Sequence, residues 1–255
     1  MSNNPFFTIL TASFNNESTI KRTLASIKNQ SFDNLEHFVI DGGSSDGTIE
    51  ILKELENSYN LSWLSEPDQG IAEALNKGLS SAKGRYIVVI QADDSLLTSD
   101  TLEKVYPLLN KQRIDILSFP VVLQHPDKGK VLRKPIRLIW WNHFKFIFPH
   151  QGCFVHQRVF KKIGGFRNEF KINMDYDFFY RALAQEISIE FGEFPVALMG
   201  GCGVGSDYRN LMKRLEEERL VQKLNEKNPF WKTAQSLFSL IYMPYKKRRL
   251  STINS

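Results

Sequence analysis

Two short acidic clusters each follow directly after an apolar run. The first is residues 41–48, Asp-Gly-Gly-Ser-Ser-Asp-Gly-Thr, and the second is residues 91–94, Gln-Ala-Asp-Asp. In an open α/β sheet the ligand crevice lies at the carboxyl ends of the strands, so carboxylates at these positions are expected to line it. A carboxylate pair there suits a divalent metal and a phosphorylated ligand better than it suits a hydrophobic core.

The second cluster has the residue types of half a metal site. Mg²⁺ and Mn²⁺ prefer oxygen ligands and are often held by one or two carboxylates together with substrate phosphates. Asp93 and Asp94 could supply those carboxylates. Alternatively they form a solvated turn or a helix cap, because Asp is common in loops.

The first cluster is less suited to phosphate. It has no Lys and no Walker spacing, and its opening carboxylate would repel a phosphate. Asp41 is better suited to accept hydrogen bonds from a nucleobase imide or a ribose. For Asp46 we favour a structural role as a helix cap.

The sequence also offers two neighbouring carboxylates as candidates for a general base. Asp175 and Asp177 lie in the first turn of a predicted helix and, being two residues apart, do not share a face. His150 and Gln151 precede a predicted strand and could face the acceptor or the phosphates of a donor. Cys153 is expected to be a small buried residue and not a nucleophile.

The hydrophobic pattern predicts four strands that alternate with three helices. This alternation indicates an α/β fold with a mostly parallel, doubly wound sheet and helices on both faces. Further elements are predicted after residue 94, including a strand over residues 114–123, a hairpin turn over 125–130, and helices over 173–187 and 207–227. The first four strands are residues 6–12, 35–40, 61–64 and 85–90, with helices over about 15–30, from 46, and from 71 to 83.

Size, composition and charge limit the class of protein. The chain has 255 residues, of which 42% are hydrophobic, and it shows no signal peptide or membrane-spanning run. Cys153 and Cys202 form no metal or disulfide pattern and fit a reducing cytoplasm. The net charge of +5 is uneven, because residues 125–150 and residues 229–255 each carry +5 and the remainder carries −5. We expect an acidic domain with two basic, aromatic patches that does not bind nucleic acid.

The C-terminal tail predicts an amphipathic helix. Its apolar residues recur at helical spacing and a basic run follows, which is typical of a helix lying on an anionic membrane surface. The alternative is a helix that packs on the domain and ends in a solvated basic tag. The residues expected to contact the membrane are Trp231, Phe238, Lys246, Lys247, Arg248 and Arg249.

Several of these segments, taken in order, resemble the family 2 glycosyltransferases over roughly residues 6–200. The closest resemblance is to bacterial members that assemble O-antigen, capsule or exopolysaccharide repeat units on a lipid carrier. The matching segments are Thr11-Ala-Ser-Phe-Asn15, the cluster at 41–48, Glu66-Pro-Asp-Gln-Gly70 through Asn76-Lys-Gly78, the cluster at 91–94, His150-Gln151, Gly164-Gly-Phe166 and Asn173-Met-Asp-Tyr-Asp177.

The resemblance implies a GT-A fold and assigns roles by position. Asp94 would bind Mn²⁺ or Mg²⁺, and Asp93 would contact the ribose or donor sugar and share the metal. Asp175 would be the base of an inverting displacement. The donor nucleotide would stack on Phe14 and contact Asp41, with Thr11, Asn15 and Asp68 completing its pocket. One departure is that Gln91 stands where the family's Asp-x-Asp form has its first Asp.

The resemblance also implies the organisation and setting of the protein. A GT-A domain over residues 1–205 would have a nucleotide-binding half (1–98) and an acceptor-binding half (99–205), followed by a helical extension over 206–255. The enzyme would be a hexosyltransferase that moves a sugar, most simply from a UDP-sugar, to a polyprenyl-diphosphate-linked saccharide. It would work in the cytoplasm, as a peripheral protein on the inner face of the cell membrane.

Two rival functions share parts of this pattern. A nucleotidyltransferase also combines an α/β nucleotide crevice with metal-binding carboxylates, but it would normally have a Gly-rich basic loop after the first strand. Residues 11–15 contain neither glycine nor a basic residue. A saccharide-binding module with an inactive site is the second rival, and only an activity measurement distinguishes it.

Overall fold

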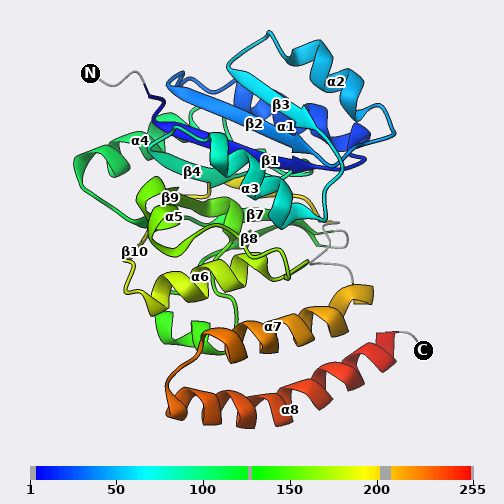
Figure 1. Cartoon of the computed structure of the whole chain (residues 1–255), viewed down its shortest axis with the longest axis vertical. Coiled ribbons are helices and arrows are strands. Elements are labelled where there is room, and N and C mark those ends of the chain that lie inside the picture. Colours follow the sequence, from blue (N-terminus) through cyan, green and yellow to red (C-terminus); the bar gives the residue numbers. More distant parts are fainter. Residues whose placement is uncertain (1–3, 126–127, 202–207, 254–255) are drawn as a thin grey trace.

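A seven-stranded sheet forms the centre of the molecule (Figure 1). The computed structural model describes residues 4–125, 128–201 and 208–253. The strand order is β10-β6-β9-β4-β1-β2-β3. Strand β9 runs antiparallel to β4 and β6, and the other pairs are parallel, which confirms the predicted mostly parallel sheet. The strands are β1 (Phe7–Ser13), β2 (Leu35–Asp41), β3 (Leu61–Ser65), β4 (Tyr86–Val89), β6 (Ile116–Ser118), β9 (Cys153–His156) and β10 (Ile189–Phe191).

Strand β1 is the point at which the order of connections reverses. The chain passes from β1 to β2 and β3 on one side and returns to β4 on the other side of β1. Loops leaving such a switch point diverge and leave a crevice. The register aligns Ser13 at the end of β1 with Asp41 at the end of β2, and Asp41 with Ser65 at the end of β3. The loops that carry both acidic clusters therefore leave the same edge of the sheet.

Helices cover both faces of the sheet, and every residue of β1 is therefore buried. Leu10 packs into a cluster with α3 and α6, whereas Ile9 packs into a second cluster with α1 and α4. Each face therefore has its own hydrophobic core. The helices are α1 (Glu17–Lys28), α2 (Thr48–Leu55), α3 (Ile71–Ser81), α4 (Thr101–Lys111), α5 (Gln157–Ile163), α6 (Met174–Ala184), α7 (Leu211–Asn225) and α8 (Pro229–Ile253), with 3₁₀ turns η1 (Ile139–His143), η2 (His150–Gly152) and η3 (Tyr208–Asn210).

A second, four-stranded sheet was not predicted from the sequence. The strand predicted over 114–123 is instead two strands, because Pro120 has no N–H to continue a ladder. Its second half, β7 (Val121–His125), joins the order β5-β11-β7-β8, with β5 (Ser95–Leu96), β11 (Ala197–Met199) and β8 (Gly129–Arg133). The predicted hairpin turn is bounded by the pair His125 and Gly129, and residues 126–127 lie outside the described part. Strand β11 leads directly to the edge where the second acidic cluster lies.

The two C-terminal helices stack beneath α6, with α8 outermost (Figure 1). Polar contacts fix this arrangement, because Glu226 between α7 and α8 accepts hydrogen bonds from the Tyr180 hydroxyl and from Nδ1 of His143. The Gln235 amide of α8 donates to the carbonyl of His143 at 2.8 Å. In the described part of the chain, none of the helices is both long and apolar enough to cross a bilayer.

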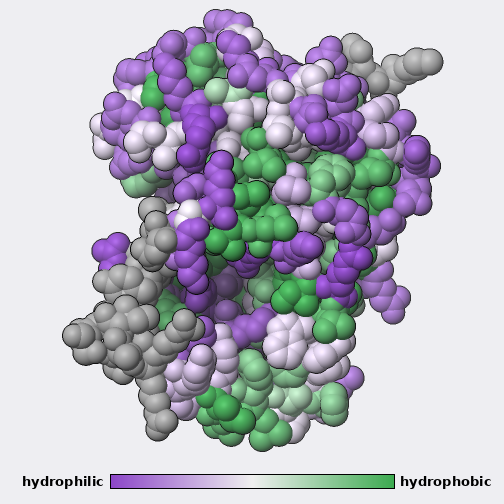
Figure 2. All heavy atoms as spheres, turned by 180° about the vertical axis from the view of Figure 1, so that it is seen from behind, coloured by the Kyte–Doolittle hydropathy of each residue, from purple (hydrophilic) through white to green (hydrophobic). Residues whose placement is uncertain are grey.

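The aromatic side chains of α8 correct part of the tail prediction. The Trp231 ring stacks on His143 with centroids 4.1 Å apart, and Phe238 packs against Phe144. Both are therefore half-buried against the domain. A different set of apolar side chains, between 56% and 77% exposed, forms the outer face of α8: Phe230, Leu237, Leu240, Ile241 and Tyr245. Figure 2 shows hydrophobic residues gathered at this lower end of the molecule. The side chains of residues 247–249 lie outside the described part.

The basic aromatic segment over residues 133–148 is only partly a surface feature. Phe148 is buried in the core beside α6 and Phe144 is buried against α8, whereas Trp140 is 48% exposed. The segment therefore anchors the C-terminal helices through buried and half-buried aromatic rings, while the Trp140 ring is exposed to solvent.

Candidate active site

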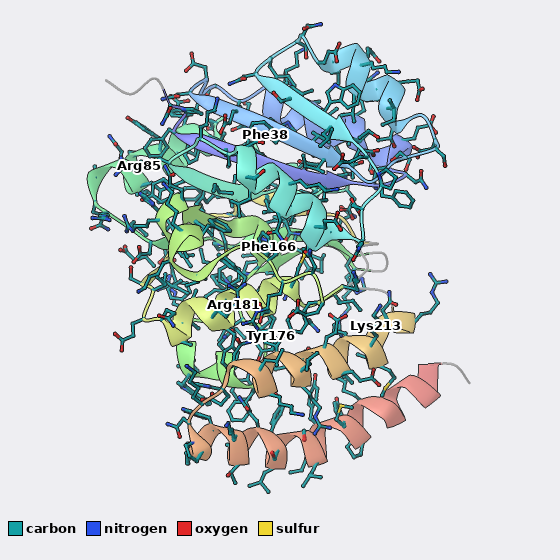
Figure 3. The ribbon with its side chains drawn as sticks, viewed as in Figure 1. Phe38, Arg85, Phe166, Tyr176, Arg181 and Lys213 are labelled. Carbon is teal, nitrogen blue, oxygen red and sulfur yellow. The ribbon has the colours of Figure 1, made fainter. Side chains whose placement is uncertain are left out.

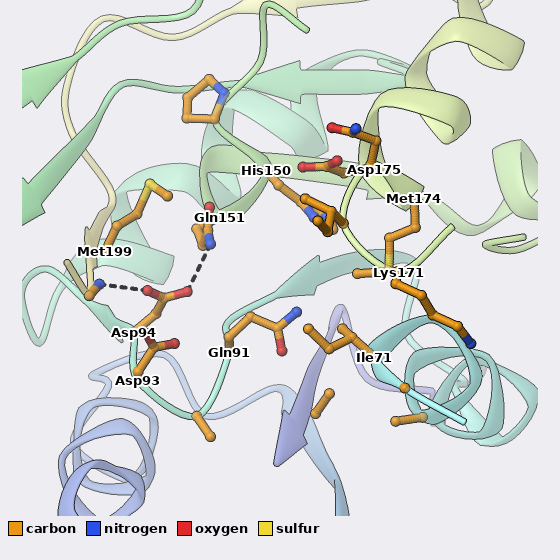
Figure 4. A pocket seen from close by; sticks show the side chains of 18 of the residues that line it. Ile71, Gln91, Asp93, Asp94, His150, Gln151, Lys171, Met174, Asp175 and Met199 are labelled. Carbon is orange, nitrogen blue, oxygen red and sulfur yellow. Dashed lines mark hydrogen bonds between the residues drawn. The ribbon is translucent and has the colours of Figure 1, made fainter. Parts of the chain in front are cut away.

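A pocket of about 910 Å³ opens at the carboxyl ends of β1 and β4. Figure 2 shows the surface hollowed, with hydrophilic residues at depth, between the upper and lower parts of the molecule. The pocket brings together candidates from distant parts of the sequence: Phe14, Asp68, Asp93, Asp94, His150, Gln151 and Asp175 all line it. In Figure 4 the acidic pair and Asp175 lie on different sides of the pocket, with His150 and Gln151 between them.

Asp94 is held firmly in the turn that follows β4. It is only 2% exposed, and its carboxylate accepts hydrogen bonds from Nε2 of Gln151 and the backbone N–H of Gly200, both at 2.8 Å (Figure 4). The Thr23 hydroxyl of α1 donates to the carbonyls of Ala92 and Asp94 at 3.0 and 2.6 Å. These contacts fix both the backbone of the turn and the orientation of the carboxylate before any ligand binds.

The electrostatics of the pair favour a cation. Burial, together with the charge of Asp93, raises the pKa of Asp94 to about 7, and burial also raises the pKa of Asp93. Two adjacent carboxylates that resist ionisation gain most from a nearby positive charge. Gly200 permits this close arrangement, because a Cβ there would lie 2.5 Å from a carboxylate oxygen of Asp93.

The donor set fits a half-site for Mg²⁺ or Mn²⁺. No cluster of three or more His, Cys, Asp or Glu side chains suited to a metal occurs among the described residues. Asp93 and Asp94 alone match the way in which these ions bind through one or two carboxylates, with the remaining positions left to phosphate oxygens and water.

Two side chains define the end of the pocket nearest β1 and β3. Phe14 is 61% exposed and lines the pocket, so its ring is available for stacking. Asp68 is half-buried and also lines it, with one carboxylate oxygen accepting from the N–H of Gly70 at 2.7 Å. Its other oxygen lies beside Gly42, where a Cβ would come within 2.9 Å of it.

Three residues predicted to bind the nucleotide do not line this pocket. Thr11 is fully buried in the sheet and donates its hydroxyl to the carbonyl of Ile90 at 2.6 Å. Asn15 joins two loops, because its side-chain oxygen accepts from the N–H of Ser45 at 2.9 Å. Asp41 is also fully buried, and its carboxylate accepts hydrogen bonds from Ser44, Gly43 and Ser65.

These contacts change the interpretation of Asp41. A carboxylate can accept about four hydrogen bonds, and Asp41 already accepts four from its own loop and from β3. It therefore shapes the loop that presents Gly42 to the pocket. Asp46 has the structural role predicted for it, since it accepts from the N–H groups of Thr48 and Glu17 at the starts of α2 and α1.

The structure separates the two candidate bases. Asp177 is fully buried, where it pairs with Arg167 at 3.0 Å and with Arg181 at 2.8 Å, and it does not line the pocket. Asp177 therefore has a structural role in the core. Asp175 lines the pocket, and burial raises its pKa to about 6. Only Asp175 is positioned to reach a ligand.

Helix α7 helps to position Asp175. The carboxylate of Glu217 accepts hydrogen bonds from the backbone N–H groups of Lys171, Ile172 and Asn173, at 2.9 to 3.1 Å. These residues form the loop that enters α6, whose second residue is Asp175. Tyr176 and Arg181 lie on the part of α6 seen in Figure 3.

The remaining candidates have defined surroundings. His150 is buried, which lowers its pKa to about 4, so it is neutral at pH 7 and can offer one N–H to a ligand. Cys153 is buried, and its pKa is raised to about 12, mainly by burial, so it is not a nucleophile. Cys202 lies outside the described residues.

The profile of the family described as Glycosyl transferase family 2 matches residues 8–187, which is most of the chain. The chain belongs to glycosyltransferase family 2. It is an enzyme that transfers glycosyl groups. The family therefore favours glycosyl transfer over the rival function of nucleotidyl transfer. An uncharacterised glycosyltransferase of Mycobacterium tuberculosis is 30% identical over 188 residues, which cover 71% of this chain and 70% of that relative.

Solved structures show that this family 2 glycosyltransferase has the predicted GT-A fold. TarS of S. aureus, residues 1–349 in complex with UDP-GlcNAc, superposes with a TM-score of 0.70 at 19% identity, covering 87% of this chain and 67% of that one. The mannosyltransferase PcManGT of Pyrobaculum calidifontis, in complex with GDP-Man and Mn²⁺, has a TM-score of 0.70 at 18% identity, with coverages of 95% and 72%. This chain spans 39% of the longer TarS structure.

Several residues of the glycosyltransferase pocket were not predicted from the sequence. Thr23 and Gly200 hold the acidic turn, but no motif distinguishes them from ordinary residues of a helix and a loop. The basic side chains that line the pocket are Arg133, Lys145, Lys171 and Arg214. Of these, Lys171 lies near Asp68, because its Nζ donates to the carbonyl of Gln69 at 2.6 Å. The excess of positive charge over residues 125–150 was the only sequence signal for any of them.

Proposed function

We propose that this glycosyltransferase moves a sugar from a nucleotide-sugar, most simply a UDP-sugar, to a lipid-linked saccharide with inversion at the anomeric carbon. The observation that carries the proposal is that Asp93, Asp94 and Asp175 share one pocket with an exposed aromatic ring. The lipid-linked acceptor would carry a polyprenyl diphosphate, as in the synthesis of O-antigen, capsule or another cell-surface polysaccharide.

The donor would lie across the ends of β1 and β4. Phe14 would stack on the nucleobase, Asp68 would accept hydrogen bonds from the nucleoside, and Asp93 would contact the ribose or the sugar. Asp94, with Asp93, would hold Mn²⁺ or Mg²⁺, which when bound neutralises charge on the departing diphosphate. The TarS and PcManGT complexes support a nucleotide-sugar donor, and the PcManGT complex supports the metal.

The transfer step then follows from the remaining groups. The acceptor hydroxyl oxygen forms a bond to the anomeric carbon while the bond from that carbon to the diphosphate oxygen breaks. Asp175 takes the hydroxyl proton, for which a pKa near the working pH is favourable. His150, neutral and buried, can donate an N–H to the sugar or to the diphosphate. A single displacement of this kind inverts the anomeric configuration.

We further propose a functional division of the chain. Residues 1–98 would bind the nucleotide, residues 99–205 would bind the acceptor, and residues 206–255 would form a helical extension. The helical extension contributes side chains to the pocket, because Arg214 and Glu218 of α7 line it.

Replacing Phe14 with Ala is expected to weaken donor binding between about 5-fold and 150-fold, because stacking on a base is worth ~1–3 kcal/mol. Titration calorimetry with UDP-, GDP- and dTDP-sugars in Mn²⁺ or Mg²⁺ measures this affinity, and donor hydrolysis measures turnover. Phe230→Ala is the matched control, since this ring is also exposed but lies on α8. If wild-type protein neither binds nor hydrolyses any of these donors, the proposed function is wrong.

The outer face of α8 would rest on the inner face of the cell membrane. Its exposed apolar residues can enter the interfacial region. Lys246 is half-buried, with its Nζ 5.4 Å from the ring centre of Tyr242, so it is not part of this outer face. The protein would then be peripheral and would meet its acceptor at the bilayer. This outer face replaces Trp231 and Phe238 as the proposed apolar contact.

Ile241→Asp is expected to reduce binding to anionic vesicles at least fivefold. The substitution removes a side chain that is 77% exposed and adds a charge that repels the surface. Flotation with phosphatidylglycerol-containing liposomes measures the bound fraction. Ser236→Asp, on an exposed position of the same helix, adds the same charge without removing an apolar group, and its effect should be small. Equal losses for both variants would contradict insertion of this face.

A further inference from the structure

Two motifs of the sequence that contain neither a donor contact nor the base lie against each other in the structure. They are Asn76-Lys-Gly78 in α3 and Gly164-Gly-Phe166 in the loop after α5. The side-chain amide of Asn76 donates to the carbonyl of Phe166 at 2.7 Å, and its oxygen accepts from the N–H of the same residue at 2.9 Å. One side chain therefore holds both backbone groups of Phe166, as a neighbouring strand would. We call these two hydrogen bonds the Asn76 latch.

Glycines on both sides of the latch allow the close approach that it needs. A Cβ at Gly165 would collide with the side-chain oxygen of Asn76, so a larger residue there would displace the amide. Gly78 lets α3 lie close to the sheet, because a Cβ there would come within 3.1 Å of the Leu10 side chain in β1. The latch therefore joins the loop to a helix that is itself packed closely on the central sheet.

The ring of Phe166 lies behind the pocket. It is buried, and its centroid lies 5.7 Å from that of His150 and 5.2 Å from that of Phe178 in α6. In Figure 3 Phe166 lies between α3 and α6. Since His150 lines the pocket, the position of the Phe166 backbone sets the packing directly behind the site and against the helix that carries the base.

The loop that holds Phe166 is also tied to α6 by polar contacts. Arg181 of α6 donates to the carbonyl of Gly165 at 2.6 Å. Arg167 forms its ion pair with Asp177, one side chain of which is fully buried in α6. Asp175 is the second residue of the same helix. The loop and the base therefore belong to one connected part of the structure, and the latch attaches that part to α3.

Helix α3 belongs to the donor side of the pocket. Ile71 and Ala74 in its first turn line the pocket, and Asp68, which we expect to bind the nucleoside, precedes the helix by three residues. A second link joins the two sides, because Nζ of Lys171 donates to the carbonyl of Gln69. That link is made by an exposed side chain, whereas the latch is half-buried. The latch is therefore expected to fix the two sides more firmly.

We propose that Asn76 is a positioning residue, which fixes Asp175 relative to the bound donor through the backbone of Phe166. The amide is required because it both donates and accepts, whereas a carboxylate could only accept. Asn76 does not line the pocket, so it acts on the reaction without touching the sugar or the metal. This inference rests on the proposed function and adds to it a residue that sets the distance between donor and base.

Single-turnover hydrolysis of a UDP-sugar in saturating Mn²⁺ tests the latch, with water in place of the acceptor hydroxyl. Asn76→Ala removes both hydrogen bonds and is expected to lower the rate at saturating donor by about 10–100-fold, because a small displacement of a catalytic group has effects of this size. The dissociation constant of the donor should stay within about twofold of wild type, because stacking on Phe14 and metal binding at Asp94 do not involve the latch. Asn76→Asp keeps the shape but sets an oxygen against the Phe166 carbonyl, and it should lower the rate in the same way.

Asn60→Ala is the matched control for the loss of an amide hydrogen bond. The Asn60 side chain donates to the carbonyl of Leu35 at 2.9 Å, at the start of β2 and thus at the sheet edge opposite the pocket. This variant should hydrolyse the donor at the wild-type rate. Circular dichroism and the stoichiometry of donor binding measure the folded fraction of each variant.

The double variant Asn76→Ala/Asp175→Asn separates positioning from a loss of folded protein. If Asn76 acts through the base, its removal costs little once the base is gone, so the double variant should hydrolyse within about threefold of Asp175→Asn alone. A loss of folded protein would instead lower the rate by the same factor in both backgrounds.

The inference is wrong if both Asn76 variants hydrolyse the donor as wild type does, if the losses from Asn76→Ala and Asp175→Asn multiply, or if Asn60→Ala lowers the rate as much. Donor affinity that falls as far as the rate would place Asn76 in donor binding and would also overturn it. Each of these results, with wild type active and Asp175→Asn impaired, refutes this inference alone. A wild-type protein that neither binds nor hydrolyses any donor, or an Asp175→Asn variant as fast as wild type, would refute the proposed function and the inference with it.

Discussion

Replacing Asp175 with Asn is expected to lower the rate of sugar transfer by about 10²–10⁴-fold, the usual contribution of a general base. The amide occupies the same space but cannot accept the proton of the acceptor hydroxyl. Donor affinity should stay within about twofold of wild type, because the donor is expected to contact Phe14 and the acidic turn. Single-turnover transfer together with donor titration separates these two effects.

The same role predicts the pH dependence of the transfer rate. Since the pKa of Asp175 is raised to about 6, the rate should fall as the pH drops through about 6, where the carboxylate becomes protonated and can no longer take a proton. A loss of activity through protonation of Asp94 would also appear on the acid side. Protons and metal compete for Asp94, so that limb would move with Mn²⁺ concentration, whereas a limb due to Asp175 would not.

Asp177→Asn provides the contrasting variant. It leaves Arg167 and Arg181 without their buried partner, and breaking such a pair typically costs about 3–5 kcal/mol of folding free energy. We therefore expect a lower unfolding temperature for this variant and an unchanged acid limb in whatever folded fraction remains. Transfer at the wild-type rate by folded Asp175→Asn protein would show that another group acts as the base.

The sequence was sufficient to predict which loops form the site. Apolar runs followed by acidic clusters predict strand ends, and parallel strands bring their ends to one edge, so Asp93 and Asp94 had to lie near the loop of Phe14. Asp175, about eighty residues further on, was linked to them only by family resemblance. No local pattern states how α6 packs against that edge.

The sequence was not sufficient to predict which side chain of each loop faces the pocket. Asp41 and Asp68 are both acidic residues after strands, yet the first is enclosed by its own loop and the second lines the pocket. That difference depends on hydrogen bonds from Ser65 and from backbone N–H groups, which spacing cannot reveal.

The prediction of which tail residues are exposed was wrong for a related reason. In the sequence the apolar residues form a single wide stripe on one helix, but in the structure this stripe is divided between the domain and the solvent. Trp231 and Phe238 pack against aromatic rings of the segment after β8, whereas Leu237 and Ile241 are exposed to solvent. Helical periodicity gives the width of an apolar face but not the number of partners it contacts.

Replacing Asp94 with Asn is expected to abolish activity and, without metal, to stabilise the fold. Losing a carboxylate that holds the metal should reduce transfer at least about a hundredfold, because metal ions supply several kcal/mol of charge stabilisation. The new amide can keep the hydrogen bond from Gly200. Gln151 can rotate its amide so that its side-chain oxygen, which has no partner in the described part of the chain, accepts from the new group.

The direction of the stability effect follows from the pKa. An aspartate has a pKa of about 3.9 in an unfolded chain, and Asp94 has one of about 7 in the folded protein. The folded state therefore binds more protons across that range, so the wild-type fold loses stability as the pH rises from about 4 to 7, and the penalty is complete above pH 7. Asp94→Asn removes the penalty, so its advantage should be largest at pH 8 and absent near pH 4.

We expect a gain of about 1–3 kcal/mol at pH 8, because relaxation and the shared charge of Asp93 reduce the full effect of the pKa difference. In this size range that corresponds to a rise of ~2–10 °C in unfolding temperature, which calorimetry in EDTA measures. Asp33→Asn, which removes an exposed carboxylate elsewhere, is the control and should change little.

Adding Mn²⁺ with UDP should reverse the order of stability. A ligand that binds only the folded state raises the unfolding temperature in proportion to the logarithm of its concentration over its dissociation constant. Wild type should gain this stabilisation and Asp94→Asn should not, so the more stable protein in EDTA becomes the less stable one in metal and nucleotide. If Mn²⁺ with UDP stabilises both proteins equally, Asp94 is not the metal ligand. If instead the variant is less stable than wild type in EDTA at pH 8, the ionised Asp94 carboxylate stabilises the fold. The proposed loss of folding free energy at the empty metal site would then be wrong.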